Sequence, residues 1–293
     1  MTIPDSVTSI GRGAFSGCSA MASVTIPNSV TLIDEFAFEF CDSLTSVTIP
    51  SSATYIGYGA FYRTGGITSI EVDSGNAHYS SDGGVLFNKD KTTLIAYPNG
   101  KAGGYTIPSS VTSIAHYAFY YSKQLTSVTI PNSVTSIGTD AFDDCESLTS
   151  IVIPESVTRI EAEAFKDCIG LTSVTIPNSV ISIDSGAFIA CGSLTSIEAS
   201  KGNAQYSSED GVLFDKHKTE LVLFPAGKSG HYTIPDSVTS IGEDAFWRCT
   251  NLTNISIPDG VTSIGERAFG ECTSLTNITI GNSVTSIGGW AFD

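Results

Sequence analysis

The chain has 293 residues, and 41% of them are hydrophobic, which is enough for a continuous core and too much for a disordered protein. Its 14 basic and 30 acidic residues give a net charge of −16, which argues against nucleic acid and against an anionic membrane surface as partners. Charged residues are only 15% of the chain and serine and threonine are abundant, so the surface is expected to be largely neutral and hydroxylated.

An Ile-Pro pair recurs along the chain and defines a repeat. It starts at Ile3 and returns with a period of 23 in most units (26 − 3), but the steps from Ile49 to Ile107 and from Ile176 to Ile234 are both 58 (107 − 49 and 234 − 176). Since 58 is 23 plus 35, each long step holds one plain unit and one unit lengthened by an insert. We therefore expect about twelve units in a single solenoid domain over residues 1–293, with inserts at about 73–104 and 200–231.

One unit shows what the repeat builds. Leu125, Val128 and Ile130 have the spacing of a leucine-rich repeat strand, with Ser and Thr between them facing outward. A proline then ends the strand, and a second extended stretch is predicted at 134–137. The Ala-Phe and Cys residues of 141–145 predict a short turn or a single helical turn. The fold class is thus a β-rich solenoid, a parallel strand ladder with short helical turns in which two units carry β-hairpin inserts.

The same unit carries a resemblance to a known family. The residues concerned are Ser136-Ile137-Gly138, Ala141-Phe142, Cys145, Leu148-Thr149-Ser150 and Ile153-Pro154. In these residues the chain resembles the BspA-like leucine-rich repeats, found in surface proteins of oral and gut bacteria and of some mucosal protozoa. The resemblance implies a secreted or cell-surface protein with an adhesive role.

Targeting segments and chain ends give further expectations. No apolar run is long enough to predict a membrane span, and residues 1–15 do not resemble a signal peptide. The chain starts and stops inside a unit, so we expect both ends to be truncated. Solenoid ends without polar caps expose unpaired strand edges, which would favour end-to-end self-association.

The seven cysteines fall at one position of the unit. We expect a buried ladder of free thiols, because parallel neighbours suit a disulfide poorly and no C-x-x-C pair points to zinc. Disulfides and a metal site are the alternatives. The positions are Cys18, Cys41, Cys145, Cys168, Cys191, Cys249 and Cys272.

Candidate partner-binding residues gather in and beside the inserts. The predicted hairpin turns hold much of the scarce basic charge, and tyrosines cluster in the units that flank the first insert. The alternative is structural: the hairpins stiffen the array and the rings cover the flank of the insert. The candidates are Lys89, Lys91, Lys216, Lys218, Tyr58, Tyr62, Tyr117, Tyr120 and Tyr121.

No complete enzyme motif is present. Gly227-Lys228-Ser229 ends like a phosphate-binding loop, but Val222 stands where that motif requires its first glycine. We therefore expect no catalytic, metal or cofactor residues. The predicted function is a non-catalytic binding or adhesion module on the cell surface or in secreted form, engaging an extracellular protein or glycan. The alternatives are a passive stalk in a larger surface protein and a carbohydrate or ice binder using the Ser/Thr strand face.

Overall fold

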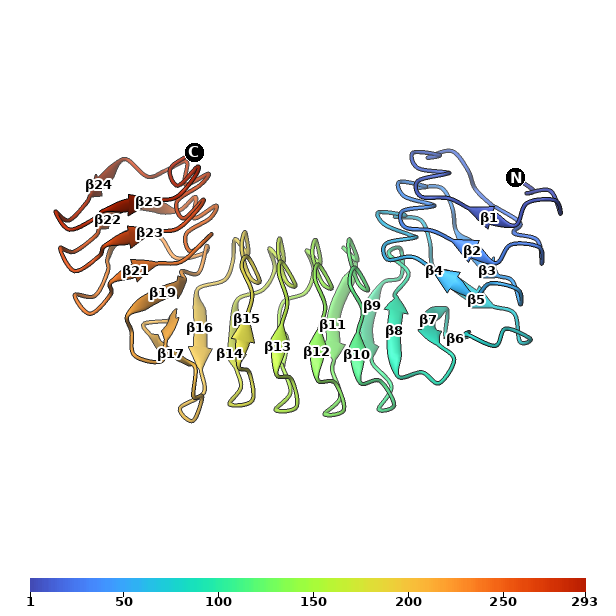
Figure 1. The fold of residues 1–293 in the computed structure, drawn as a ribbon, viewed down its shortest axis with the longest axis horizontal. Coiled ribbons are helices and arrows are strands. Elements are labelled where there is room, and N and C mark those ends of the chain that lie inside the picture. The colour runs from blue at the N-terminus through green and yellow to red at the C-terminus, as the bar shows by residue number, and fades with distance from the viewer. The chain divides into compact units, whose positions relative to one another are not determined.

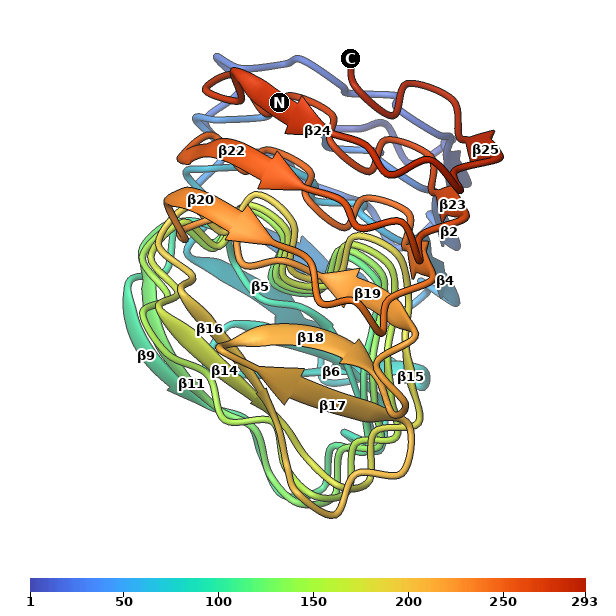
Figure 2. The ribbon, with the colours of Figure 1, turned by 90° about the vertical axis from the view of Figure 1, so that its left-hand side faces the viewer.

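A computed structural model describes residues 1–293, which divide into two compact units, Met1–Glu146 and Ser147–Asp293. Each unit is a stack of coils, one for each predicted sequence repeat (Figure 1). A coil contains a longer strand, a shorter strand and a series of turns (Figure 2). The apolar side chains are buried inside the coil. We call the three outer surfaces the long-strand face, the short-strand face and the turn ridge.

The Leu-Thr-Ser-Val-Thr-Ile segments form the longer strands, which pair in parallel within each unit. Their side chains alternate between exposed Ser or Thr and buried Val or Ile, as the sequence predicts. In unit 1 these strands are β3 (Ser46–Ile49), β5 (Ser69–Val72), β9 (Gly103–Thr106) and β11 (Leu125–Thr129). In unit 2 they are β14 (Ser173–Ile176), β16 (Ser196–Ala199), β20 (Gly230–Thr233), β22 (Leu252–Ser256) and β24 (Asn277–Thr279).

The Val-Thr-Ser-Ile segments form the shorter strands, which are also parallel to their neighbours. Threonines beside these strands tie one coil to the next: the Thr31 hydroxyl donates to the Thr8 carbonyl at 3.3 Å, and later coils repeat the bond. In unit 1 the short strands are β1 (Ser9–Ile10), β2 (Leu32–Ile33), β4 (Tyr55–Ile56), β10 (Ser113–Ile114) and β12 (Ser136–Ile137). In unit 2 they are β13 (Arg159–Ile160), β15 (Ser182–Ile183), β21 (Ser240–Ile241), β23 (Ser263–Ile264) and β25 (Ser286–Ile287).

The turn ridge corrects one expectation, because it contains no helical turn. In a typical coil Tyr117 and Tyr121 both adopt φ of 60°, and left-handed residues at this spacing interrupt a right-handed helix. The N–H groups of Tyr117, Phe119 and Tyr121 donate instead to carbonyls of the following coil, at 2.7–3.0 Å. The ridge is therefore held by bonds between coils, as the strands are. No helix of the length and hydropathy of a membrane span occurs.

The core consists of side-chain ladders that run along each unit. Phenylalanines stack from coil to coil, with ring centroids 5.2 Å apart for Phe15 and Phe38 and 4.7 Å apart for Phe246 and Phe269. All seven cysteines are free thiols, and five are fully buried, which confirms the predicted ladder for those five. Cys18, in the first coil, is exposed, and Cys272 is partly exposed.

Candidate functional site

Each insert is an antiparallel meander that ends in a coil strand. β6 (Tyr79–Asp82) pairs with β7 (Val85–Asn88), β7 pairs with β8 (Thr93–Ala96), and β8 joins β10 in parallel. The second insert repeats this arrangement with β17 (Tyr206–Glu209), β18 (Val212–Asp215) and β19 (Glu220–Leu223), which joins β21. The predicted hairpins correspond to the last two strands of each meander. The first strand was not predicted.

A buried asparagine fastens each insert to the preceding coils. The Asn76 amide donates to the carbonyls of Pro50 and Ala53 at 2.8 and 2.9 Å, and its oxygen accepts from the N–H groups of His78 and Tyr79. Asn203 makes the same four bonds in the second insert. Sequence reasoning missed both residues, although the repeated Gly-Asn-Ala-x-Tyr-Ser-Ser segment was a signal.

The tyrosine of that segment closes a strand edge. The Tyr79 hydroxyl accepts the N–H of Ile56 in β4 at 2.9 Å, and the Tyr206 hydroxyl accepts the N–H of Ile183 in β15 at 2.8 Å. Burial raises the pKa of both phenols. The short-strand ladder therefore stops at each insert, and a side chain satisfies the edge.

The insert lysines hold their own inserts together. Lys91 pairs with Asp82 at 2.7 Å, and Lys218 pairs with Glu209 at 2.9 Å. Lys89 and Lys216 donate to the carbonyls of Asn76 and Asn203, respectively. Each of the four candidate lysines thus makes a contact within its own insert, and each remains at least partly exposed to solvent.

The inserted coils have a shortened turn ridge. Tyr97 takes the place of the ladder phenylalanine, but it follows Leu94 by three residues, whereas Phe119 follows Ile114 by five. The ridge N–H groups of the preceding coil, at Gly59, Phe61 and Arg63, consequently lack the carbonyl partners found in regular coils. The ridges on either side of the insert meet directly. We call the meeting point a joint.

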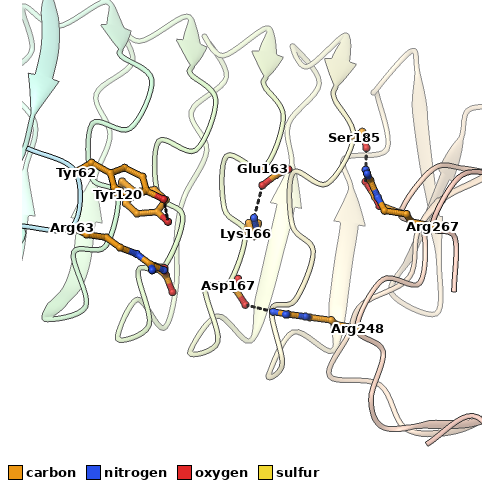
Figure 3. Close-up of polar contacts among 11 residues, drawn as sticks. Tyr62, Arg63, Tyr120, Glu163, Lys166, Asp167, Ser185, Arg248 and Arg267 are labelled. Carbon is orange, nitrogen blue, oxygen red and sulfur yellow. Dashed lines mark hydrogen bonds and ion pairs between the residues drawn. The ribbon is translucent and has the colours of Figure 1, made fainter. Parts of the chain in front are cut away.

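The joint of unit 1 is aromatic, and it unites most of the candidate tyrosines. Tyr62 and Tyr120 stack with ring centroids 4.1 Å apart, and the Tyr62 hydroxyl donates to that of Tyr120 at 2.5 Å (Figure 3). Tyr117 packs edge-on against both rings. Burial raises the pKa of Tyr62 and Tyr120, and for Tyr120 the hydrogen bond from Tyr62 adds to this effect.

Two cations cover the outer side of this aromatic joint. The Arg63 guanidinium lies 5.0 Å from the centroid of the Tyr121 ring, and the Lys123 ammonium lies 4.4 Å from it. Arg63 also pairs with Asp144 at 2.8 Å. Cation–π contacts of this kind hold a partly exposed ring in a fixed orientation.

Tyr58 differs from the other candidates because half of its surface is exposed. Its accessible fraction is 50%, compared with 5% for Tyr120. Its ring meets His116 edge-on at 4.8 Å, and the His116 Nδ1 accepts the N–H of Thr139 at 2.9 Å. Tyr58 and the Tyr121 edge thus form the accessible part of the aromatic joint.

The joint of unit 2 is polar where Ser185, Asp244 and Arg248 take the places of Tyr58, Tyr117 and Tyr121, while Ile189 and Trp247 take those of Tyr62 and Tyr120. Ser185 donates to Asp244 at 2.7 Å, and Arg267 contacts the same carboxylate at 2.8 Å. Arg248 forms ion pairs with Asp167 at 3.5 Å and Glu271 at 2.7 Å. The two joints share a backbone design but differ in chemistry.

Comparison with known proteins supports the repeat assignment. The family model described as "BspA type Leucine rich repeat region (6 copies)" matches residues 1–98, 96–209 and 224–293. The chain belongs to the BspA type leucine-rich repeat family. A search of curated proteins finds no match.

Several solved bacterial structures, among them leucine-rich repeat proteins, are similar to this chain. The pneumococcal vaccine antigen PcpA is 25% identical, with a TM-score of 0.68, over 95% of this chain and 67% of PcpA. A leucine rich cell surface protein from Faecalibacterium prausnitzii is 26% identical, with a TM-score of 0.58, over 97% and 70% of the two chains. A leucine-rich repeat protein from Eubacterium ventriosum is 26% identical, with a TM-score of 0.57, over 100% and 75%.

Proposed function

We propose that this chain is a non-catalytic binding module displayed on the cell surface or secreted, where it engages an extracellular protein or glycan. Family membership and the similarity to a cell surface protein and a vaccine antigen support the location. The net charge of −16 favours a partner with basic groups and predicts that weak contacts are sensitive to salt.

The aromatic joint is the observation that carries the proposal. Tyrosine and arginine are enriched in protein interfaces because they combine a large contact area with a polar end. Here Tyr58 is half exposed, and Tyr121 is held between Arg63 and Lys123. The contacts of Tyr58 with His116 and of Tyr121 with the two cations hold these rings, so binding would cost little ordering entropy.

The insert lysines are the second proposed element of the surface. Lys91 and Lys218 each retain about a third of their side-chain exposure within an ion pair. A partner carboxylate or sulfate could share such an ammonium without breaking the hairpin. The lysines would then add charge selectivity to a site centred on the aromatic joint.

The experiment is a solid-phase screen against extracellular matrix proteins, mucins and glycans at physiological salt. The double variant Tyr58→Ala/Tyr121→Ala is compared with Val152→Ala, which removes an exposed apolar side chain of unit 2. We expect at least a tenfold loss of affinity for the tyrosine variant and no change for the control. Equal binding by all three proteins would move the site away from the aromatic joint.

A passive spacer is the second candidate function. The internal engagement of the insert lysines and of Tyr62 and Tyr120 favours it, because each of these groups already stabilises the chain. A spacer would bind none of the probes while remaining fully folded.

A further inference from the structure

The polar joint of unit 2 contains a cleft that its counterpart in unit 1 lacks. The cleft measures about 160 Å³ and is lined by Ser185, Gly186, Glu220, Val222 and Glu243, among others. At the corresponding place in unit 1 only about 20 Å³ is open, enough for one water molecule. A volume of about 150 Å³ accommodates a group the size of benzene.

The aromatic side chains are arranged differently at the two joints. Tyr120 leans back onto Tyr62 and fills the joint of unit 1. Its counterpart in unit 2, Trp247, lies over the following coil instead, where a Cβ on Gly270 would come within 2.3 Å of the indole. Arg267 holds the indole there by a cation–π contact at 5.9 Å. Ser185 and Glu243 line the cleft at the positions that Tyr58 and His116 occupy in unit 1, where the two rings meet edge-on at 4.8 Å.

Backbone donors at this joint have no partners. In the preceding coil the N–H groups of Glu163 and Phe165 donate to the carbonyls of Ser185 and Ala187, at 3.2 and 2.8 Å. The N–H groups at the same positions of the joint coil, Gly186 and Phe188, have no such bond, because the insert has no full ridge. Gly186 is buried but lines the cleft, and its N–H group makes no backbone hydrogen bond in the chain.

Glu220 supplies an uncompensated negative charge at the rim of the cleft. Asp184 pairs with Arg159 at 2.7 Å and Glu243 pairs with Arg267 at 3.1 Å, but Glu220 has no ion pair. Partial burial raises the pKa of Glu220, and the Asp215 carboxylate raises it further. A cation beside Glu220 would relieve both effects.

We infer that this cleft binds an arginine or lysine residue of a partner polypeptide. The carbonyl of that residue accepts the Gly186 N–H, and its side-chain cation pairs with Glu220. A basic peptide residue offers a carbonyl acceptor for the Gly186 N–H and a cation for Glu220. A metal ion offers no acceptor, and Glu220 would repel an anion. The site lies in unit 2 and does not depend on the aromatic joint of unit 1.

The test is a titration of the full chain, followed by NMR, with the peptide acetyl-Gly-Arg-Gly-amide and its neutral citrulline analogue. We expect saturable shifts of the Gly186 amide with the arginine peptide and at least tenfold weaker binding of the citrulline peptide. Glu220→Gln should weaken binding of the arginine peptide at least tenfold. Asp236→Asn, which removes an exposed charge outside the cleft, should leave binding unchanged.

Three results would overturn the inference: equal binding of both peptides, unchanged binding by Glu220→Gln, or an equal loss with Asp236→Asn. Tyr58→Ala serves as a separate control, because it alters the aromatic joint and should not affect the peptide titration. Loss of the proposed function and loss of this site would therefore be seen in different variants.

Discussion

At the scale of single residues, buried hydroxyl groups show whether a residue that departs from the repeat keeps the hydrogen bond of the residue it replaces. Thr64 replaces a ladder cysteine and keeps the bond to the preceding coil, with its hydroxyl 2.9 Å from the Phe38 carbonyl. Cys145 and Cys191 make the equivalent bond through sulfur at 3.2 and 3.1 Å. The Tyr97 hydroxyl, by contrast, is buried without a partner.

Tyr97→Phe should therefore stabilise the protein. An unsatisfied buried polar group costs about 1–3 kcal/mol, so we expect a gain of about 1 kcal/mol and a rise in Tm of about 2–3 °C. The second insert has Phe224 at this position, stacked on Phe246 at 4.8 Å. Phe224→Tyr is the matched control and should lower Tm. A lower Tm for Tyr97→Phe would contradict the assignment of this hydroxyl as unsatisfied.

The cysteine ladder predicts a graded thiol reactivity. Burial raises the pKa of Cys41 to about 11, and burial also raises the pKa of Cys145 and Cys249. These thiols stay protonated at pH 8, and only a thiolate reacts readily. A hydrogen bond from Cys249 lowers the pKa of the partly exposed Cys272, and Cys18 is exposed.

Titration with a thiol reagent at pH 8 should label Cys18 first and Cys272 second. The five buried thiols should react only after unfolding in denaturant. Rapid labelling of more than two thiols in the folded protein would contradict the buried ladder.

At the scale of elements, the inserts depend on one side chain each. Asn76→Ala would leave two buried carbonyls and two N–H groups without their partners, so we expect a loss of about 3 kcal/mol. Urea unfolding measures this loss, and amide exchange should be faster in β6 than in the wild type. Asn203→Ala should act in the same way on β17. Asn28→Ala, at an exposed asparagine, is the control and should change stability by less than about 0.5 kcal/mol.

The sequence predicted the strands that the repeat dictates and the hairpin of each insert, but it missed the first strand of each meander and the form of the turn ridge. The strand spacing, outward Ser and Thr, buried Phe and cysteine ladders all follow from the constant repeat period, because every coil has the same neighbours. The helical turn was wrong because left-handed residues alternate along the ridge: the Tyr117 and Phe119 N–H groups bond to the next coil, and only the N–H groups between them, such as that of Tyr120, bond within their own coil. The sequence of a single coil does not show which carbonyls its ridge N–H groups will bond to.

The joints were only partly predictable for a related reason. The sequence placed the tyrosines near the first insert, but the Tyr62–Tyr120 contact depends on the shortened ridge of the inserted coil. The open cleft at Glu220 lies where Ser185 and Glu243 stand in place of the Tyr58–His116 contact of unit 1. The spacing of residues in the sequence predicts neither arrangement. Asn76 and Asn203, by contrast, stand at the same place in a segment that both inserts repeat, and this repetition was a signal.

At the scale of the whole molecule, the repeat supplies uniform surfaces and the inserts supply the exceptions. The long-strand and short-strand faces vary little from coil to coil, and many of their threonine hydroxyls already donate to the neighbouring coil. Distinctive chemistry occurs at the two joints, aromatic in unit 1 and polar in unit 2. The central claim is that partner recognition resides at the inserts and their joints.

The most direct test replaces both lengthened units by plain repeat units and repeats the screen of matrix proteins, mucins and glycans. Circular dichroism and thermal unfolding establish that the shortened chain folds. We predict that saturable binding by the intact chain is lost in the shortened one. Binding that survives the replacement would contradict the account and place recognition on the hydroxyl-rich strand faces.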